Sequence, residues 1–357
     1  MISSKFALCS AAIISILLAG CAAPGTQRVA VNDAAVKAEE RKQMEIVADE
    51  MLSEQIRLNN VRWRIATKGK AVCREDVGPL LGLQSMTRPK GQMGDILAAR
   101  FGITEKPTIV HVVPGSPAEL AGIRKGDILK SINGIEITSP QSLEDVNEKW
   151  TQGSPFSVSL ERNASPVTVT AMPEMGCKYP VGLSPQQIIN AFADGKRVMI
   201  ARGMMNFAKD DNELALVVSH EIAHNSMKHI DAKKQNMGLG FLADLAAILL
   251  SKGQVSNTNF AGIAASAYSQ EFEAEADYVG LYLMANAGLP IDDAPRFWRR
   301  MAAAHPQNIK TNHSASHPST SYRMVALEET VKEIQGKISR SEPLLPNMKE
   351  GKLFIAK

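Results

Sequence analysis

The segment at residues 217–230, VVSHEIAHNSMKHI, constrains the fold more than any other stretch of the chain. It places His220 and His224 four residues apart, and residues at this spacing lie on one face of a helix. Their imidazoles can then converge on one metal ion, while Glu221 reaches only its open side, in the arrangement written HExxH. The same residues could instead form the solvent-exposed face of an ordinary helix. A third metal ligand is needed to distinguish the two interpretations.

That third ligand has to come from another helix. The motif does not continue into the HExxHxxGxxH pattern, and His229 falls five residues after His224, where we expect it to point off the metal face as a surface or core-edge residue. A second helical pattern at residues 266–290 supplies Glu273 and Asp277, four apart and on one face. One could bind the metal while the other accepts a hydrogen bond from a ligand histidine. An acidic, solvated helix start is the alternative.

The N-terminus has the pattern of an exported protein. Lys5 is the single positive charge before an apolar run at residues 6–20, which is short for a membrane-spanning helix. The run closes on Leu-Ala-Gly before Cys21, which resembles the lipobox of bacterial lipoproteins, whose cysteine carries the lipid. A plain signal peptide with an incidental cysteine is the alternative. Because Ala22 is not the aspartate that retains such proteins at the inner membrane, the resemblance implies a lipid anchor in the outer membrane, facing the periplasm.

Composition narrows the class of protein. The chain has 357 residues, enough for two domains, and its 45% hydrophobic and 22% charged residues are ordinary for a folded protein. The net charge is +3 without a long basic run, so nucleic acid is not an expected partner. Once the leader is removed and Cys21 is lipidated, Cys73 and Cys177 remain, and an oxidising envelope makes them candidates for one disulfide. Two separate buried cysteines are the alternative.

The middle of the chain is punctuated by turns. Residues 107–137 hold a β-branched run, a Gly-Ser-Pro turn, a short helical stretch, a Gly-Asp turn, a strand and an Asn-Gly turn. This order resembles a PDZ domain of the bacterial protease-associated type, which binds an extended peptide as an added strand. Within the resemblance, Phe101, Gly102 and Ile103 are similar to the apolar-Gly-apolar loop whose amides hold a terminal carboxylate. The alternative is that these three residues belong to the core of a strand.

Four blocks in the second half of the chain carry a second resemblance: NAFADGKRVMIARGMM, NELALVVSHEIAH, EAEADYVGLYLMANAG and SHPSTSYR. In this order they resemble the gluzincin metallopeptidases, which include the HtpX, CaaX-prenyl, OMA-type and BepA-like proteases. The likeness covers about residues 178–330. It implies that Glu273 is the third ligand, with Asp277 completing its Glu-x-x-Ala-Asp motif, whereas Glu271 and Glu275 lie out of register.

The same resemblance assigns further residues. His317 precedes a proline and is followed by Arg323, as in the family; it would stabilise the oxyanion of the transition state or cap the metal as a fourth ligand. His313 is the rival for this role but lacks the following proline. The strand at residues 197–203 is expected to be the sheet edge on which the substrate lies extended.

We therefore predict an α+β fold, with a mainly helical zincin-type peptidase domain, a small sheet and an inserted, β-barrel-like PDZ domain. Asp210 and Glu213 are expected to cap the helix that carries the histidines. The apolar run at residues 237–250 is expected to be a buried helix, with a membrane-leaning helix as the alternative. The expected parts are a signal peptide (1–20), a tether (21–45), an N-terminal helical part of the peptidase (46–87), the PDZ domain (88–175), the catalytic domain (176–335) and a tail (336–357).

The function expected from these observations is a zinc-dependent metalloendopeptidase of the bacterial envelope, with one Zn²⁺ per subunit. His220, His224 and Glu273 would hold the zinc, Glu221 would be the general base, and the PDZ domain would recognise or position the polypeptide substrate. Unfolded or misassembled envelope proteins are the expected substrates. A peptide-binding adaptor, or a chaperone-like lipoprotein with gated or vestigial protease activity, is the alternative. The sequence does not set an oligomeric state.

Overall fold

The computed structural model describes residues 26, 29–138, 140–235, 260–304, 317 and 321–349, without the side chains of residues 140, 141 and 260–269. The expectations for the signal peptide, Cys21, the apolar run 237–250, His313, Pro318 and the end of the tail lie outside the described residues. The chain divides into two units, Met1–Val47 and Ala48–Lys357.

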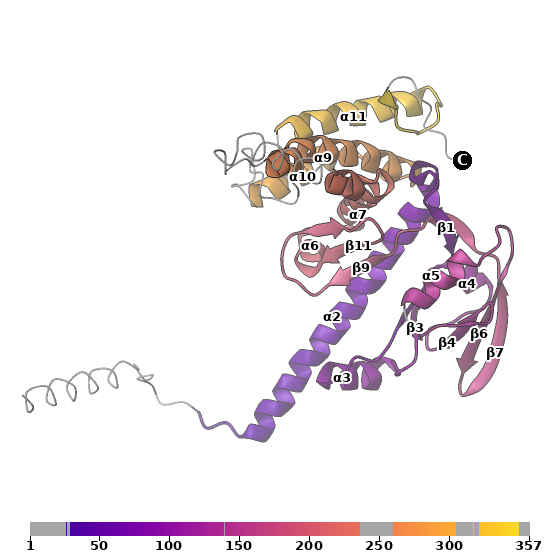
Figure 1. Cartoon of the computed structure of the whole chain (residues 1–357). Coiled ribbons are helices and arrows are strands. Elements are labelled where there is room, and N and C mark those ends of the chain that lie inside the picture. Colours follow the sequence, from indigo (N-terminus) through magenta and orange to yellow (C-terminus); the bar gives the residue numbers. More distant parts are fainter. Residues whose placement is uncertain are drawn as a thin grey trace, which may run out of the picture. The chain divides into compact units, whose positions relative to one another are not determined.

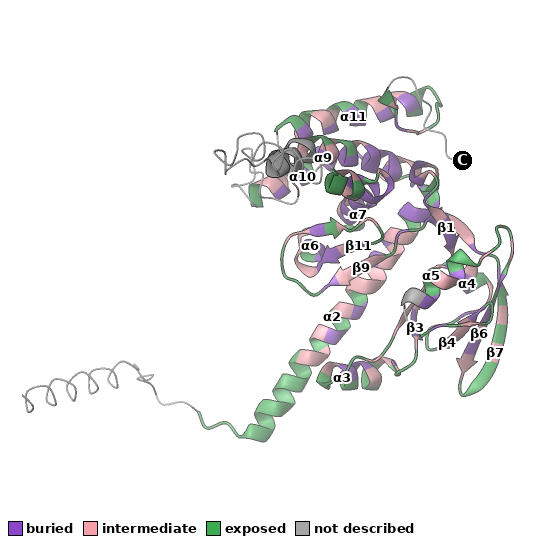
Figure 2. Ribbon diagram, viewed as in Figure 1, coloured by how far each residue is buried: buried purple, intermediate pink, exposed green. Residues whose placement is uncertain are grey.

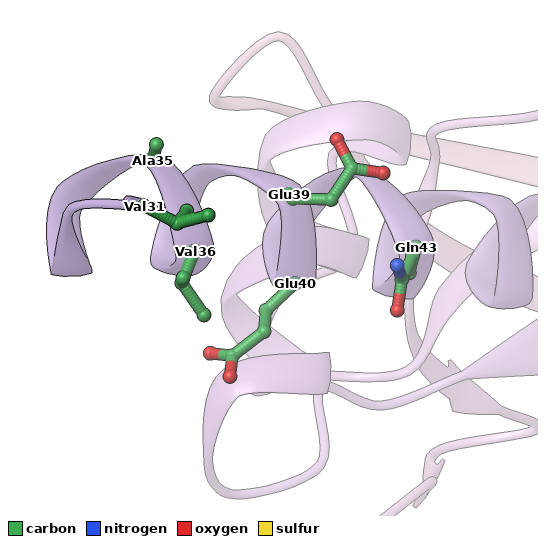
Figure 3. Close-up of a pocket in the computed structure, with 6 residues that line it drawn as sticks. All are labelled: Val31, Ala35, Val36, Glu39, Glu40 and Gln43. Carbon is green, nitrogen blue, oxygen red and sulfur yellow. The ribbon is translucent and has the colours of Figure 1, made fainter. Parts of the chain in front are cut away.

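The first unit contains the start of helix α2 (Asp33–Lys68). Asn32 caps it, because its side-chain oxygen accepts a hydrogen bond from the backbone N–H of Ala35 at 2.7 Å. Aliphatic, carboxylate and amide side chains on this part of the helix line a hollow on its surface (Figure 3): Val31, Ala35, Val36, Glu39, Glu40 and Gln43.

The second unit holds a helical part built on a three-stranded sheet. The strands are β9 (Val181–Ser184), β10 (Ala191–Ala193) and β11 (Val198–Ala201), and the helices are α6 (Arg202–Phe207), α7 (Asp211–Ser226), α9 (Phe260–Asn286), α10 (Ala294–Ala304) and α11 (Ser321–Ser339). The sheet, α7, α9 and α11 follow one another as layers (Figure 1). No helix in the described part of the chain is both long enough and apolar enough to cross a membrane.

The strand order of this sheet corrects one expectation. The strand within residues 197–203 is β11, which lies in the middle of the sheet, antiparallel to β10 and parallel to β9. Because neighbours on both sides use its backbone groups, β11 has no free edge for a substrate. β10 is the outer strand on the side of the site, and Phe192 and Ala193 from it line a cavity described below.

Helix α7 forms the centre of the core. Every residue from Leu214 to Ser226 is buried, and buried residues continue along α9 (Figure 2). Its N-terminus is capped as predicted, since the side chain of Asp210 accepts from the N–H of Glu213 at 2.9 Å. In return, the Glu213 carboxylate accepts from the N–H of Lys209 at 2.7 Å. The polar residues of the motif are therefore held inside the protein and do not form a wet helix face.

A second sheet, with three short helices, forms a small domain of its own. Its strands are β2 (Leu83–Met86), β3 (Thr108–Val112), β4 (Ile128–Ile132), β5 (Ile135–Glu136), β6 (Phe156–Arg162) and β7 (Ser165–Ala171), and its helices are α3 (Gln92–Phe101), α4 (Pro117–Leu120) and α5 (Pro140–Glu148). The order is β2-β3-β4-β6-β7, with β5 paired to β4, so β2 is an edge strand. This edge strand precedes residue 88, where the domain was expected to begin.

Phe101, Gly102 and Ile103 do not form the expected loop. Phe101 ends helix α3, and Gly102 caps it in the left-handed conformation, with φ 68°. The N–H of Gly102 bonds to the carbonyl of Ala98 at 2.9 Å, and Ile103 is buried. The Gly102 amide is thus engaged in ending a helix and does not point at a ligand.

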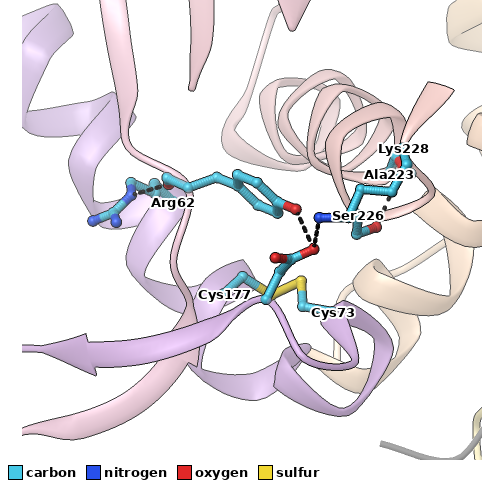
Figure 4. The surroundings of a disulfide bond; sticks show 8 residues. Arg62, Cys73, Cys177, Ala223, Ser226 and Lys228 are labelled. Carbon is cyan, nitrogen blue, oxygen red and sulfur yellow. Dashed lines mark hydrogen bonds and ion pairs between the residues drawn. A yellow bond between two sulfur atoms is a disulfide. The ribbon is translucent and has the colours of Figure 1, made fainter. Parts of the chain in front are cut away.

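A two-stranded ribbon connects the two parts of this unit. Strand β1 (Val77–Leu80) pairs antiparallel with β8 (Glu174–Cys177), so the chain enters and leaves the small sheet domain side by side. A disulfide between Cys73 and Cys177 closes the base of the ribbon, and both cysteines are fully buried (Figure 4). The bond ties together the two ends of the inserted domain.

The buried carboxylate of Asp76 fixes this junction to the end of α7. It accepts a hydrogen bond from the Tyr179 hydroxyl at 2.7 Å and pairs with the ammonium groups of Lys178 and Lys228. Burial alone would raise the pKa of Asp76, but these three partners hold it below its usual value. Asp76 is therefore an ionised anchor between the disulfide and the residues that follow the motif helix.

Removing the disulfide is expected to destabilise the protein. Replacing both Cys73 and Cys177 with Ala should lower the free energy of unfolding by about 2–5 kcal/mol, because the bond closes a long loop in the unfolded chain. The separation of 104 residues places this bond among the long-loop cases. Urea unfolding of the oxidised native chain and the double variant measures the difference. Equal unfolding midpoints would contradict this role of the bond.

Candidate metal centre

Three side chains from two helices meet at one point. The Nε2 atoms of His220 and His224 on α7 lie 3.1 Å apart. The Glu273 carboxylate on α9 lies 3.3 Å from His220 Nε2 and 3.2 Å from His224 Nε2. All three residues are buried, with exposed fractions of 1%, 6% and 3%. Two imidazole nitrogens and one carboxylate oxygen therefore converge, and with His317 they form a group whose ligand atoms all lie within 4.8 Å of one another.

Gly280 allows the two helices to approach closely enough for this convergence. A Cβ atom at Gly280 would lie 3.2 Å from the backbone nitrogen of His220 and 3.3 Å from its Cα. Glu273 precedes Gly280 by two helical turns on α9, so the contact at Gly280 sets how near its carboxylate comes to α7. The position of the third ligand thus depends on a residue that has no side chain.

Enlarging Gly280 should disturb both stability and metal binding. We expect Gly280→Val to destabilise the protein by about 1–3 kcal/mol, because the added methyl groups meet rigid backbone. Gly336→Val is the matched control, since a Cβ there meets only the flexible guanidinium of Arg340. Thermal unfolding and metal affinity of the two variants test this. Equal behaviour of the two variants would show that the close approach at Gly280 is unimportant.

Buried charges orient the ligands. Asp277 Oδ1 lies 3.0 Å from Nδ1 of His220, the ring nitrogen that faces away from the ligand cluster. Arg323 donates two hydrogen bonds to the Asp277 carboxylate, at 2.7 and 2.8 Å, and its Nη1 lies 3.1 Å from Glu273. Arg323 is only 1% exposed and lies over the Trp298 ring. This arrangement fixes the His220 ring and balances the two buried carboxylates.

His317 lies beside the same cluster. Its Nδ1 is 3.0 Å from Glu273 Oε2 and 3.4 Å from His220 Nε2. On the other side, its Nε2 lies 3.2 Å from the carbonyl of Ala191 on β10, to which it can donate, and 3.6 Å from Oε1 of Glu221. The single ring thus bridges the ligand cluster and the outer strand of the sheet.

Glu221 faces the cluster without joining it. It is 2% exposed, and its Oε2 atom is buried without a hydrogen-bond partner among the described residues. A buried carboxylate oxygen without a partner is costly unless a proton, water or ion satisfies it. Glu221 also lines a cavity of about 140 Å³ together with Phe192, His224 and His317. The carboxylate is therefore placed to act on a molecule held in this cavity.

The pKa values suit a positive ion at the centre. Burial lowers the pKa of His224 to about 4, so its imidazole is neutral at neutral pH. Burial also opposes the charged form of His220, but Asp277 and Glu273 raise its pKa to about 10, so a bound metal ion would replace the proton on its Nε2. Burial would raise the pKa of Glu273, yet His317, His224 and Arg323 hold it well below its usual value. An ionised carboxylate and two imidazoles that converge in this way fit a metal ion.

His229 and Glu275 stay outside the ligand group, as expected, but the sequence did not predict their contacts. His229 was expected to point off the metal face, because a continuous helix would carry it there. Helix α7 instead ends at Ser226, and Lys228 adopts the left-handed conformation with φ 59°, which turns the chain back. His229 then contacts His224, and Glu275 contacts His229. No local signal marks Lys228 for this conformation, so the sequence offered no means of finding the contact.

Comparison with known proteins assigns both parts of the second unit. Residues 163–331 match peptidase family M48, and residues 108–160 match the PDZ domain. The mitochondrial metalloendopeptidase OMA1 of Schizosaccharomyces pombe is 35% identical over 45% of this chain and 51% of that protein. The putative beta-barrel assembly-enhancing protease of Vibrio cholerae is 32% identical over 32% of this chain and 26% of that protein. The aligned regions thus span about half or less of these relatives.

Among solved structures, this chain is similar to the PDZ domain of HtrA3 bound to a phage-derived ligand. The alignment covers 28% of this chain and 88% of the HtrA3 domain, at 19% identity and a TM-score of 0.23. The predicted α+β class, with a helical peptidase part and a PDZ part, is confirmed by the structure and the domain matches. The chain carries a domain of peptidase family M48 joined to a PDZ domain.

Proposed function

We propose that this protein is a zinc-dependent metalloendopeptidase that hydrolyses peptide bonds in unfolded or misassembled polypeptides. The observation that carries the proposal is the convergence of His220, His224 and Glu273, with the Glu221 Oε2 atom beside them, which has no hydrogen-bond partner in the described part of the chain. Two imidazoles and a carboxylate that leave one side open are the donor set of catalytic zinc sites in peptidases. The match to family M48 and the named metalloendopeptidase relatives support the same chemistry.

His220, His224 and Glu273 would hold the zinc, one ion per subunit. When bound, zinc supplies Lewis acidity that polarises the scissile carbonyl and lowers the pKa of water to about 7. Glu221 then takes a proton from the attacking water and passes it to the leaving amine. Its burial favours this role, because the carboxylate competes with little bulk water for that proton.

His317 would act on the substrate carbonyl. Burial alone would lower its pKa, but the Glu273 and Glu221 carboxylates raise it above the usual value, so the ring can carry the proton that an oxyanion accepts. Its contacts to Glu273 and to the Ala191 carbonyl also fit a resting state in which the ring occupies the site. In that state the substrate has to displace His317 from β10.

Substrate binding would use two outer strands. β10, beside the cavity, would hold the segment to be cleaved, and β2, at the edge of the PDZ sheet, would take an extended chain end. The lysine and apolar run that precede Cys21 support a bacterial envelope protein anchored by lipid in the outer membrane and facing the periplasm. Unfolded envelope proteins are the corresponding substrates.

A chaperone-like or adaptor protein with gated proteolysis is the second candidate. The observation that favours it is the position of His317, which contacts the ligand cluster, Glu221 and the outer strand at once. If His317 blocks the site, the native chain should be inactive and the His317→Ala variant should cleave the substrate. If His317 only stabilises the oxyanion, the native chain should be active and the His317→Ala variant should be less active.

Removal and return of the metal test the main proposal. The full chain is stripped with a chelator, and cleavage of unfolded casein is measured before and after one equivalent of Zn²⁺ is returned. We expect cleavage by the native chain or by His317→Ala to stop on stripping and to return with zinc. Cleavage that persists in the stripped protein would rule out the metal mechanism.

A further inference from the structure

His229 contacts the metal-ligand histidine from behind. Helix α7 ends at Ser226, Lys228 adopts the left-handed conformation, and His229 after it contacts a residue of the helix that it follows. Its Nδ1 lies 3.0 Å from Nδ1 of His224, on the side of that ring opposite the ligand cluster. His229 is 3% exposed, so this contact is shielded from water.

The His229 ring is itself held on two sides. Its Nε2 lies 2.9 Å from Glu275 Oε2, and its face stacks on the Phe272 ring, with centroids 4.7 Å apart and an interplanar angle of 20°. Glu275 follows Glu273 by two residues on α9 and therefore points away from the cluster. Glu275, which lies out of register for metal binding, thus contacts His229, the neighbour of the ligand His224.

Only one arrangement of protons satisfies all three groups. His224 can bind a metal through Nε2 only if that nitrogen carries no proton, so its proton resides on Nδ1. This N–H then donates to Nδ1 of His229, which must accept. The remaining proton of His229 lies on Nε2 and is donated to the Glu275 carboxylate. Each donor has an acceptor, and the sequence of bonds leaves His224 Nε2 free for a metal.

We propose that His229 is a positioning residue that fixes the tautomer and ring orientation of His224, with Glu275 as its anchor. The proposal rests on the metal site described above and adds to it. It makes the two ligand histidines similar in one respect, since the Nδ1 atom of each lies 3.0 Å from a polar atom of another side chain. Nδ1 of His220 lies beside Asp277, which is buried and paired with Arg323. Nδ1 of His224 lies beside the His229 imidazole, which contacts the Glu275 carboxylate.

The sizes of the expected effects follow from exposure. Loss of a group that orients a metal ligand reduces metal affinity by about 10–100-fold, and His229, in direct contact with His224, belongs in this range. The Glu275 side chain is 45% exposed, so water can replace part of its interaction with His229. Its removal should lower metal affinity less than about 10-fold.

Zinc affinity of the full chain tests the role of His229, measured by competition with a chelating dye. His229→Phe keeps a ring against Phe272 but removes the nitrogen acceptor. His229→Asn restores an acceptor, because its amide oxygen sits where Nδ1 of His229 does. We expect the affinity to fall about 10–100-fold in the Phe variant and to recover in large part in the Asn variant. The visible absorption of the Co²⁺-loaded proteins should change in the Phe variant alone.

A second pair of variants controls for a loss of affinity that is caused by misfolding. Glu275→Ala should weaken zinc binding several-fold, whereas Glu271→Ala, an exposed carboxylate on the same helix, should leave it unchanged. Native affinity in His229→Phe, equal losses in the Phe and Asn variants, or equal affinities for Glu275→Ala and Glu271→Ala would each overturn the positioning role. A native chain that binds no zinc would overturn the metal site itself, which is a separate result.

Discussion

Substitution of Glu221 by Gln is expected to lower the rate of peptide cleavage by about 10²–10⁴-fold and to leave zinc binding unchanged. The amide has nearly the same size and keeps an oxygen at the site, but it cannot take a proton from water. Glu221 is absent from the converging ligand set, and its Oε2 has no partner among the described residues. The variant should therefore lose the chemical step without losing the metal. Casein cleavage and zinc content, measured on the same preparation, separate the two.

Glu271→Gln provides the matched control for this experiment. It makes the same chemical change at an exposed position two residues from a metal ligand, so it should retain native cleavage. Loss of zinc from Glu221→Gln would mean that Glu221 is a ligand, and native activity in that variant would mean that another group takes the proton.

Substitution of Arg323 by Met is expected to lower the free energy of unfolding by about 3–5 kcal/mol. The two hydrogen bonds to Asp277 and the contact with Glu273 disappear, while both carboxylates stay buried. Arg323 is only 1% exposed, so water cannot replace the lost partner. Urea unfolding of the metal-free protein measures the change, and zinc affinity should fall as well, because Asp277 no longer has a fixed position beside His220.

An exposed arginine calibrates this result. Arg299 pairs with Glu328 at the surface, where the arginine side chain is 53% exposed. Arg299→Met should change stability by about 0–1 kcal/mol, as is usual for surface ion pairs. A loss in Arg323→Met that is no larger than the loss in Arg299→Met would contradict the structural role assigned to the buried pair.

The sequence predicted best those features that depend on local spacing. His220 and His224 share a helix face because of their separation of four, and Asp210 caps the same helix through a bond to a residue three positions later. Glu273 came from the family resemblance, and the structure places it against both histidines. Helix α9 can bring Glu273 close to α7 because Gly280 has no side chain at the contact with His220. The pattern of apolar residues does not reveal this contact.

The failures share a tertiary cause. β11 has the apolar pattern of a strand, but its place in the middle of the sheet depends on pairing with β9 and β10. Gly102 lies between two apolar residues, a pattern that fits a binding loop and a helix cap equally, and α3 before it decides for the cap. His229 returns to the site because one non-glycine residue, Lys228, is left-handed. Pairing and chain reversal of this kind are set by the whole fold.

The position of bound zinc decides whether the three converging side chains are its ligands. Crystals of the zinc-loaded chain, measured on both sides of the zinc absorption edge, should show one anomalous peak per subunit between His220 Nε2, His224 Nε2 and the Glu273 carboxylate. A zinc-loaded protein without a peak among these three residues, or with its only peak elsewhere, would contradict the metallopeptidase account.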